Sequence, residues 1–280
     1  MKLSKEQLKG RIRNVANKNN ADARVLLRQF MMERFLERLS KSEYRDNFVI
    51  KGGTLVTAMT GVSLRSTMDV DTTIRGFNLN DDEAQRIVNE IMSIDLDDNA
   101  LFYIKSVEDI MDEMDYSGIR LHIESYYDKL YVPIKIDIST GDVITPGAVE
   151  YEYKQILSDE TIKLWSYNIE TVLAEKIQTI LNRGVLNTRM RDFYDIHILL
   201  KLYERDIDVS VLKNAYIATA EKRQTNMLLN NSKRILQDVG DSTEVLRDWE
   251  RYRKKYKYAS NISFEEVIES SKSLCSMILY

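Results

Sequence analysis

The spacing of apolar residues divides the chain into two parts that differ in predicted secondary structure. Residues 23–39 carry apolar side chains three and four positions apart, which predicts an amphipathic helix. Three segments between residues 102 and 139 alternate apolar and polar positions, which is typical of half-buried strands. Helical spacing dominates again from residue 169 onward. We therefore predict a mixed α/β lobe with N-terminal helices at residues 1–155 and a helical lobe at residues 156–280.

A short apolar run at residues 48–50 predicts a strand that ends in a sharp turn. Gly52 and Gly53 supply that turn, and Thr54 is placed to cap a helix that continues to about residue 59. The first N–H groups of such a helix and the positive end of its dipole attract anions. We therefore expect Lys51, Gly52, Gly53 and Thr54 to contact the phosphates of an NTP.

Two acidic residues follow on a second predicted strand, at residues 66–74. Asp69 and Asp71 are two positions apart, so their side chains share one face of that strand. Neighbouring carboxylates repel each other unless a cation lies between them, and Mg²⁺ binds a few carboxylates together with phosphate oxygens. We expect both residues to bind Mg²⁺ or Mn²⁺. Arg65 is expected either to contact the phosphates or to pair with a nearby carboxylate.

A third carboxylate completes this group. Asp137 lies in the alternating segment 132–139, and we expect it to be a third metal ligand that also helps to position the attacking hydroxyl. Two metal ions clamp the attacking and leaving oxygens when a phosphoryl group is displaced in line. The glycine turn, the acidic pair and Asp137 together predict metal-assisted nucleotidyl transfer. Taken singly, the glycines are an ordinary turn and the acids an exposed strand.

A second group of charged residues lies in residues 169–198, a segment rich in apolar positions. Lys176 is placed to reach a cleft and hold the β- and γ-phosphates. Asp192 and Asp195 are three positions apart on the following predicted helix and share a face. The alternative is a salt-bridge network that ties the two helices together.

The overall charge limits the kinds of partner. The 280 residues include 40 basic and 44 acidic side chains, which gives a net charge of −4. RNA therefore has to bind locally. The best candidate is residues 247–258, RDWERYRKKYKY, because cations neutralise phosphates and aromatic rings stack on bases. The alternative is a solvated basic helix whose aromatic rings lie in the core.

The numbers of cysteines and histidines limit which cellular compartment and which kinds of metal site we expect. The single cysteine, Cys275, excludes an intramolecular disulfide framework, and two histidines leave little scope for a zinc site. The N-terminus lacks the apolar core of a secretory signal, and no apolar run has the length that crosses a bilayer. We expect a cytoplasmic protein with no membrane association.

Five strings carry a resemblance to a known family. In this order, KGGTL, LRSTMDVD, KIDIS, LAEK and RMRDFYDI resemble the nucleotidyltransferase-like abortive-infection toxins of the AbiEii/AbiGii type, over about residues 48–200. The resemblance implies an α+β protein of the DNA polymerase β-like nucleotidyltransferase fold, in which a mixed-sheet lobe and a C-terminal helical lobe complete one active-site cleft. It also implies that Asp69 and Asp71 bind metal and that Lys176 and Asp195 are essential to activity.

The resemblance further implies a function. Members are toxins that limit phage spread by slowing growth of the host cell, and each is encoded beside an antitoxin. Relatives transfer a nucleotide from an NTP, in some cases to the acceptor end of tRNA. We expect a Mg²⁺-dependent enzyme with GTP or CTP as candidate donors and tRNA as the acceptor. The alternatives are a nucleotidyltransferase that acts on a small molecule or a protein, and an NTP-binding module without turnover.

Overall fold

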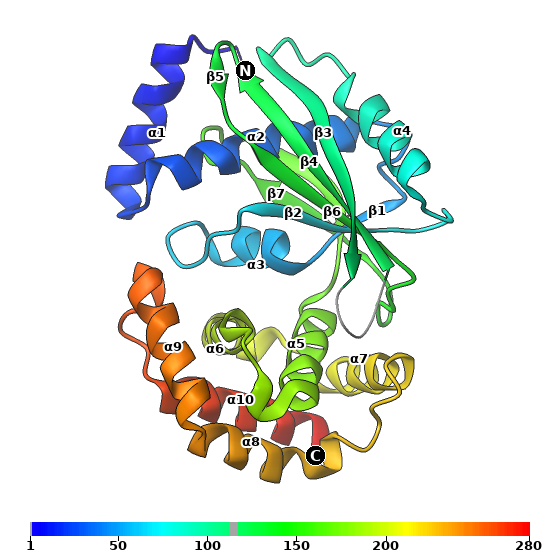
Figure 1. Ribbon diagram of the computed structural model, residues 1–280, viewed down its shortest axis with the longest axis vertical. Helices are drawn as coiled ribbons and strands as arrows, with labels where there is room; N and C mark the ends of the chain where they lie inside the picture. The colour runs from blue at the N-terminus through cyan, green and yellow to red at the C-terminus, as the bar shows by residue number, and fades with distance from the viewer. Residues whose placement is uncertain (1, 112–116) are drawn as a thin grey trace. The chain divides into compact units, whose positions relative to one another are not determined.

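A mixed β-sheet forms the centre of the N-terminal part of the chain (Figure 1). The computed structural model describes residues 2–111 and 117–280, and eight strands of that part of the chain belong to the sheet. They are β1 (Phe48–Ile50), β2 (Asp69–Ile74), β3 (Ala100–Met111), β4 (Ser117–Tyr127), β5 (Leu130–Tyr131), β6 (Ile134–Thr140), β7 (Val149–Lys154) and β8 (Thr161–Ser166). The strand order is β3-β4-β6-β2-β1-β8-β7, with β5 paired to β4. β2 is parallel to β6 and β1 is parallel to β8, whereas the other pairs are antiparallel.

The helices of this part are α1 (Lys5–Asn19), α2 (Ala23–Lys41), α3 (Gly52–Thr60) and α4 (Asp81–Met92). The apolar stripe of α2 is buried, and the helix contacts β6, β8 and α4. Since α4 in turn contacts β3 and β4, both helices cover the same face of the sheet (Figure 1). α1 begins with the capping box that the spacing of Ser4 and Gln7 indicates.

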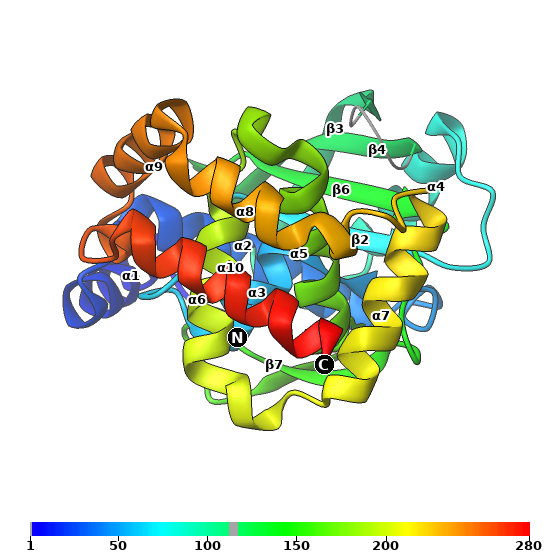
Figure 2. The same cartoon turned by 90° about the horizontal axis from the view of Figure 1, so that it is seen from below.

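The C-terminal part is helical, as its periodicity predicts. It contains α5 (Ile169–Arg183), α6 (Met190–Tyr203), α7 (Val209–Lys222), α8 (Ser232–Asp241), α9 (Thr243–Lys255) and α10 (Phe264–Leu279). α10 contacts α6, α7 and α8 (Figure 2). Val267 and Leu274 on α10 are fully buried, so this helix supplies much of the core of the bundle. None of the described helices has both the length and the apolar character that a membrane span requires.

The chain forms two compact units. The first comprises Met1–Asp142 and Ala148–Tyr167, and the second comprises Val143–Gly147 and Asn168–Tyr280. The predicted α+β class, a mixed-sheet lobe followed by a helical lobe, is confirmed. The lobe boundary expected at residues 155–156 falls in the turn between β7 and β8, which pair with each other inside the first unit.

A buried ion pair fixes α2 against the start of β3. The guanidinium of Arg38 donates to both carboxylate oxygens of Asp98 at 2.8 Å, and both side chains are almost fully buried. Arg38 also donates to the carbonyl oxygen of Ala100. The pair therefore holds the main helix of the unit to an edge strand of its sheet.

Asp98→Ala is expected to lower the free energy of unfolding by about 3–5 kcal/mol, because it leaves a buried guanidinium without its carboxylate. Urea denaturation followed by circular dichroism measures this. The control is Glu152→Ala, which removes an exposed partner of Lys163 and should change stability little. Equal effects of the two substitutions would contradict the importance of the buried pair.

Glu33 on α2 makes stability depend on pH. Burial raises the pKa of its carboxyl to about 8, and the backbone N–H of Ile156 donates to it at 3.2 Å. Between about pH 5 and 8 the folded protein keeps a proton that the unfolded chain has released, so the free energy of unfolding falls as pH rises through this range. Glu33→Gln should flatten that profile and be more stable than the wild type at pH 8.5. Denaturant titrations at several pH values measure this, and the same pH dependence of the free energy of unfolding in Glu33→Gln and in the wild type would refute the assignment. Glu160→Gln, at an exposed position, is the control.

Candidate active site

The glycine turn and the acidic pair are in direct contact. Gly52 is the first residue of α3 and has a φ of 53°, a backbone conformation that favours glycine. A Cβ on Gly52 would lie 2.9 Å from Cβ, Cγ and Oδ2 of Asp71, and one on Gly53 would lie 2.7 Å from Oγ1 of Thr67. Both glycines are therefore needed for the N-terminus of α3 to approach β2 this closely.

Thr54 joins α3 to β2 through its backbone and its side chain. Its N–H donates to Oδ2 of Asp71 at 3.2 Å, and its hydroxyl donates to the carbonyl oxygen of Asp69 at 3.0 Å. The expectation that Thr54 caps the helix is wrong: the N-cap is Lys51, and Thr54 is the third helical residue. The carboxylate of Asp71 takes the place of a local cap, because it lies on the strand that pairs with β1 and its Oδ2 accepts from the N–H of Thr54 in the first turn of the helix.

Asp69, Asp71 and Asp137 share one face of the sheet. Asp69 and Asp71 alternate along β2, and Asp71 lies directly opposite Asp137 on β6. Burial, followed by the charges of Asp137 and Asp69, raises the pKa of Asp71 to about 6. The neighbouring carboxylates thus lie close enough to destabilise the charged form of Asp71.

This donor set fits a divalent cation in part. Mg²⁺ commonly takes one or two carboxylates and fills its remaining positions with water and substrate phosphates. Asp69 and Asp71 supply two carboxylates whose charge is unfavourable without a cation, so they fit that pattern. In residues 2–111 and 117–280, however, no group of three or more acidic, histidine or cysteine residues is arranged to hold an ion. The three-ligand assignment stays a prediction.

Asp137 is engaged by a residue that the sequence did not point to. Nε and Nη2 of Arg120 on β4 donate to its two carboxylate oxygens at 2.8 and 2.7 Å. Two-point pairing of this kind is the strongest that arginine forms with a carboxylate.

Lys51 is held in a polar cluster at the end of β6. Its ammonium donates to Oγ of Ser139 at 2.7 Å and pairs with Oδ2 of Asp142, whose side chain is fully buried. The hydroxyl of Tyr167 donates to the same oxygen of Asp142 at 2.5 Å. Asp142 and Tyr167 were not found from the sequence, because they lie 91 residues and 116 residues from Lys51 and only the sheet brings them together.

The remaining residue predicted for this unit is Arg65. It is buried, and its guanidinium donates to the carbonyl oxygen of Ser66. Its contact with phosphates stays a prediction.

In the helical unit, Lys176 joins two carboxylates of the next helix. Its ammonium on α5 lies 2.9 Å from Oδ1 of Asp192 and 2.8 Å from Oδ2 of Asp195, both on α6. Arg189 donates to the other oxygen of Asp192 at 3.1 Å. The salt-bridge network that was the alternative interpretation is therefore present, and the catalytic roles of Lys176 and Asp195 stay predictions.

The basic and aromatic residues of segment 247–258 separate by burial. Trp249 and Tyr252 are buried, and their rings stack 5.5 Å apart. The side chains of Arg247, Arg251, Lys254, Lys255 and Lys257 are exposed. Arg253, Tyr256 and Tyr258 are half-buried. Two of the four aromatic rings and five of the six basic side chains thus match the alternative stated for this segment, and RNA binding there stays a prediction.

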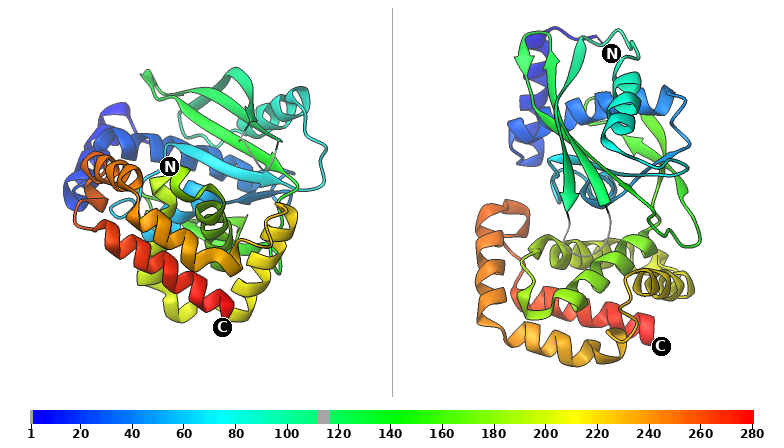
Figure 3. Two further views of the ribbon diagram at one scale, coloured as in Figure 1. Left: turned by 60° about the horizontal axis from the view of Figure 1, so that its bottom comes forward. Right: turned by 45° about the vertical axis from the view of Figure 1, so that its right-hand side comes forward.

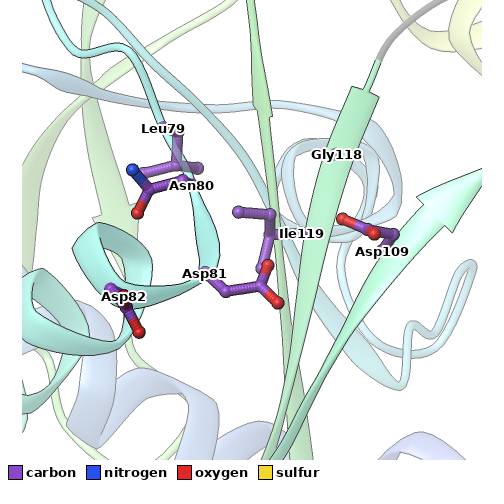
Figure 4. A pocket seen from close by; sticks show the side chains of 7 residues that line it. All are labelled: Leu79, Asn80, Asp81, Asp82, Asp109, Gly118 and Ile119. Atoms are coloured by element: carbon purple, nitrogen blue, oxygen red, sulfur yellow. The ribbon is translucent and has the colours of Figure 1, made fainter.

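One surface pocket of the first unit contains none of the predicted site residues (Figure 4). It is lined by Leu79, Asn80, Asp81, Asp82, Asp109, Gly118 and Ile119. Its three acids make it unsuited to phosphate groups.

Comparisons with known proteins address the family and the fold. Residues 34–270 match the family model described as nucleotidyl transferase AbiEii toxin, type IV toxin–antitoxin system. The fold is similar to that of JHP933 from Helicobacter pylori, with 16% identity, a TM-score of 0.53, and coverage of 91% of this chain and 90% of that chain. It is also similar to an H. pylori protein provisionally named a nucleotidyltransferase, with 17% identity, a TM-score of 0.51, and coverage of 91% and 93%. No curated protein matches the chain.

Lys176→Met is expected to destabilise the fold by about 3 kcal/mol or more, because it removes the cation between two buried carboxylates. Lys201→Met, at an exposed position of α6, is the control and should have little effect. Denaturant unfolding measures both variants. Unchanged stability of Lys176→Met would show that the network is not structural.

Proposed function

Because the chain belongs to the AbiEii nucleotidyl transferase toxin family of type IV toxin–antitoxin systems, we propose that it transfers a nucleotide from an NTP to an RNA acceptor in a Mg²⁺-dependent reaction. The proposed acceptor class is tRNA. The family implies a cognate antitoxin, and we propose that the activity slows growth of the host cell and so limits phage spread.

The observation that carries the proposal is the contact between the N-terminus of α3 and Asp71. The first N–H groups of a helix have no acceptor within it, and the dipole makes this end positive. Here that end lies against Asp71, with Asp69 two positions along β2. A triphosphate at Gly52 and Gly53 and a cation at the two carboxylates would thus be neighbours, as nucleotidyl transfer requires.

Five residues of the first unit have a proposed role in this reaction. Asp69 and Asp71 hold the cation, which when bound offsets phosphate charge and favours the attacking oxygen. The backbone of Gly52 and Gly53 receives the phosphates. Lys51 adds positive charge beside them, and its position is set by Asp142 and Ser139.

The proposed parts of Lys176 and Asp195 belong to the helical unit. Lys176 would contact phosphate, and Asp195 would act as a base or organise the acceptor hydroxyl. Their mutual salt bridge of 2.8 Å holds the two side chains next to each other. Support for these roles comes from the resemblance of the strings LAEK and RMRDFYDI to the family, rather than from the network itself.

The direct test is incubation of the purified protein with Mg²⁺, total tRNA and each α-labelled NTP in turn. We expect label on RNA with one NTP, loss of at least about a hundredfold in Asp69→Ala, and no labelling in EDTA. Asp238→Ala, at an exposed acid on α8, is the matched control and should keep wild-type activity.

The outcomes separate the proposal from its rivals. Label on a protein or a small molecule, with none on RNA, would replace the proposed acceptor while keeping the reaction. Binding of NTP without label on any acceptor would favour a module without turnover. Full activity in Asp69→Ala would overturn the metal assignment.

A further inference from the structure

Charged residues form a row across four neighbouring strands of the sheet. Asp71 on β2 is in register with Asp137 on β6, Asp137 with Arg120 on β4, and Arg120 with Glu108 on β3. Residues in register on adjacent strands have side chains on the same face, so these four lie side by side. The long β3 and β4 strands that carry Glu108 and Arg120 are seen from two directions in Figure 3.

Arg120 takes up both oxygens of Asp137. The guanidinium uses its Nε and Nη2 atoms for this, and its Nη1 atom faces Oε1 of Glu108 at 3.7 Å. The Arg120 side chain is 28% exposed and that of Asp137 is 17% exposed, so the pair is partly shielded from water. A cation on Asp137 would have to lie against a guanidinium that is already in contact with both oxygens, and the two positive charges would repel each other.

A hydrogen bond to the backbone of Asp137 helps to hold this residue in the row. The hydroxyl of Thr72 on β2 donates to the carbonyl oxygen of Asp137 at 2.9 Å, which fixes β6 against the strand of the acidic pair. In the adjacent row, Asp69 lies opposite Lys135. Arg120 on β4 is separated from Asp69 and Asp71 on β2 by the single strand β6, so its charge lies close to the acidic pair.

The number of charges on this face also fits a single divalent cation at Asp69 and Asp71. Asp69, Asp71, Asp137 and Glu108 carry four negative charges on this face, and Arg120 on β4 and Lys135 on β6 offset two of them. The two that remain are those that one divalent cation neutralises. In the described part of the chain, no third carboxylate is arranged with Asp69 and Asp71 to hold an ion.

We propose that Arg120 stands in for a cation at Asp137, so that the metal site consists of Asp69 and Asp71 alone and Asp137 serves to hold Arg120. Arg120 is thus a positioning residue: its fixed positive charge lies beside the metal site and sets how strongly that site attracts a divalent ion. This inference rests on the proposed function, because it takes Asp69 and Asp71 as the metal ligands.

The test is Mn²⁺ binding without nucleotide, measured by electron paramagnetic resonance of free Mn²⁺ and by calorimetry. The informative variant is Arg120→Gln/Asp137→Asn, which removes one positive and one negative charge together. We expect its Mn²⁺ affinity to stay within about threefold of the wild type, because no ligand is lost. A loss of tenfold or more would overturn the inference, since it would identify Asp137 as a ligand.

Thermal melting shows whether the double variant is folded. If it is not, two further measurements still test the inference. Arg120→Gln alone should raise Mn²⁺ affinity about tenfold, because it removes the repelling charge and frees Asp137; unchanged affinity would overturn the inference. In the wild type, the bound Mn²⁺ should give the spectrum of an isolated ion. A spin-coupled pair, expected for ions about 3.5–4 Å apart, would also overturn it.

Asp69→Ala separates failure of this inference from failure of the proposed function. If Asp69→Ala binds Mn²⁺ as the wild type does, the metal assignment fails and both proposals fall with it. If Asp69→Ala loses affinity and the double variant loses it as well, only the part assigned to Arg120 is wrong.

Discussion

The first unit depends on the close approach of the N-terminus of α3 to the carboxylate of Asp71. Gly52 and Gly53 allow this approach because a side chain at either position would collide with Asp71 or Thr67. Thr54 then fixes it with a backbone and a side-chain hydrogen bond to β2. The pairing of β2 with β1 and β6 fixes the rest, because it places Asp69, Asp71 and Asp137 on a common face.

Several buried acids elsewhere in the chain have basic partners that set their geometry, whereas Glu33 accepts from a backbone N–H and has a pKa that burial raises to about 8. Lys51 pairs with Asp142, Arg38 with Asp98, and Lys176 with two carboxylates of α6. Asp71 differs from them, because burial and neighbouring carboxylates raise its pKa towards neutrality. Strongly shifted pKa values cluster at binding and catalytic sites, and the carboxylates that raise the pKa of Asp71 lie beside it on the same face of the sheet. The contrast between Asp71 and the paired acids therefore supports a cation site at β2.

The succession of short elements along the chain made part of this site predictable from the sequence. Strand, glycine turn, helix and acidic strand follow one another within 27 residues, from Phe48 to Ile74, and spacing alone gives the shared face of Asp69 and Asp71. The expectation that Thr54 caps α3 was wrong because the acceptor for the first turn of this helix is Asp71 on β2, which the local sequence pattern does not indicate. The partners of Asp137 and Lys51 depend on strand register, which a sequence pattern leaves open. The network of Lys176 could be stated as an alternative because charges at helical spacing predict it.

The N-terminus of α3, where Gly52 and Gly53 are proposed to receive the phosphates, and the acidic pair Asp69 and Asp71 are proposed to act as one site. Calorimetric titration of Mn²⁺ into the protein, with and without a non-hydrolysable NTP and corrected for association of Mn²⁺ with the nucleotide, tests it most directly. The account predicts that the nucleotide raises Mn²⁺ affinity at least about tenfold and that Mn²⁺ raises nucleotide affinity by the same factor, as linkage requires. Mn²⁺ affinity that is the same with and without nucleotide would contradict it.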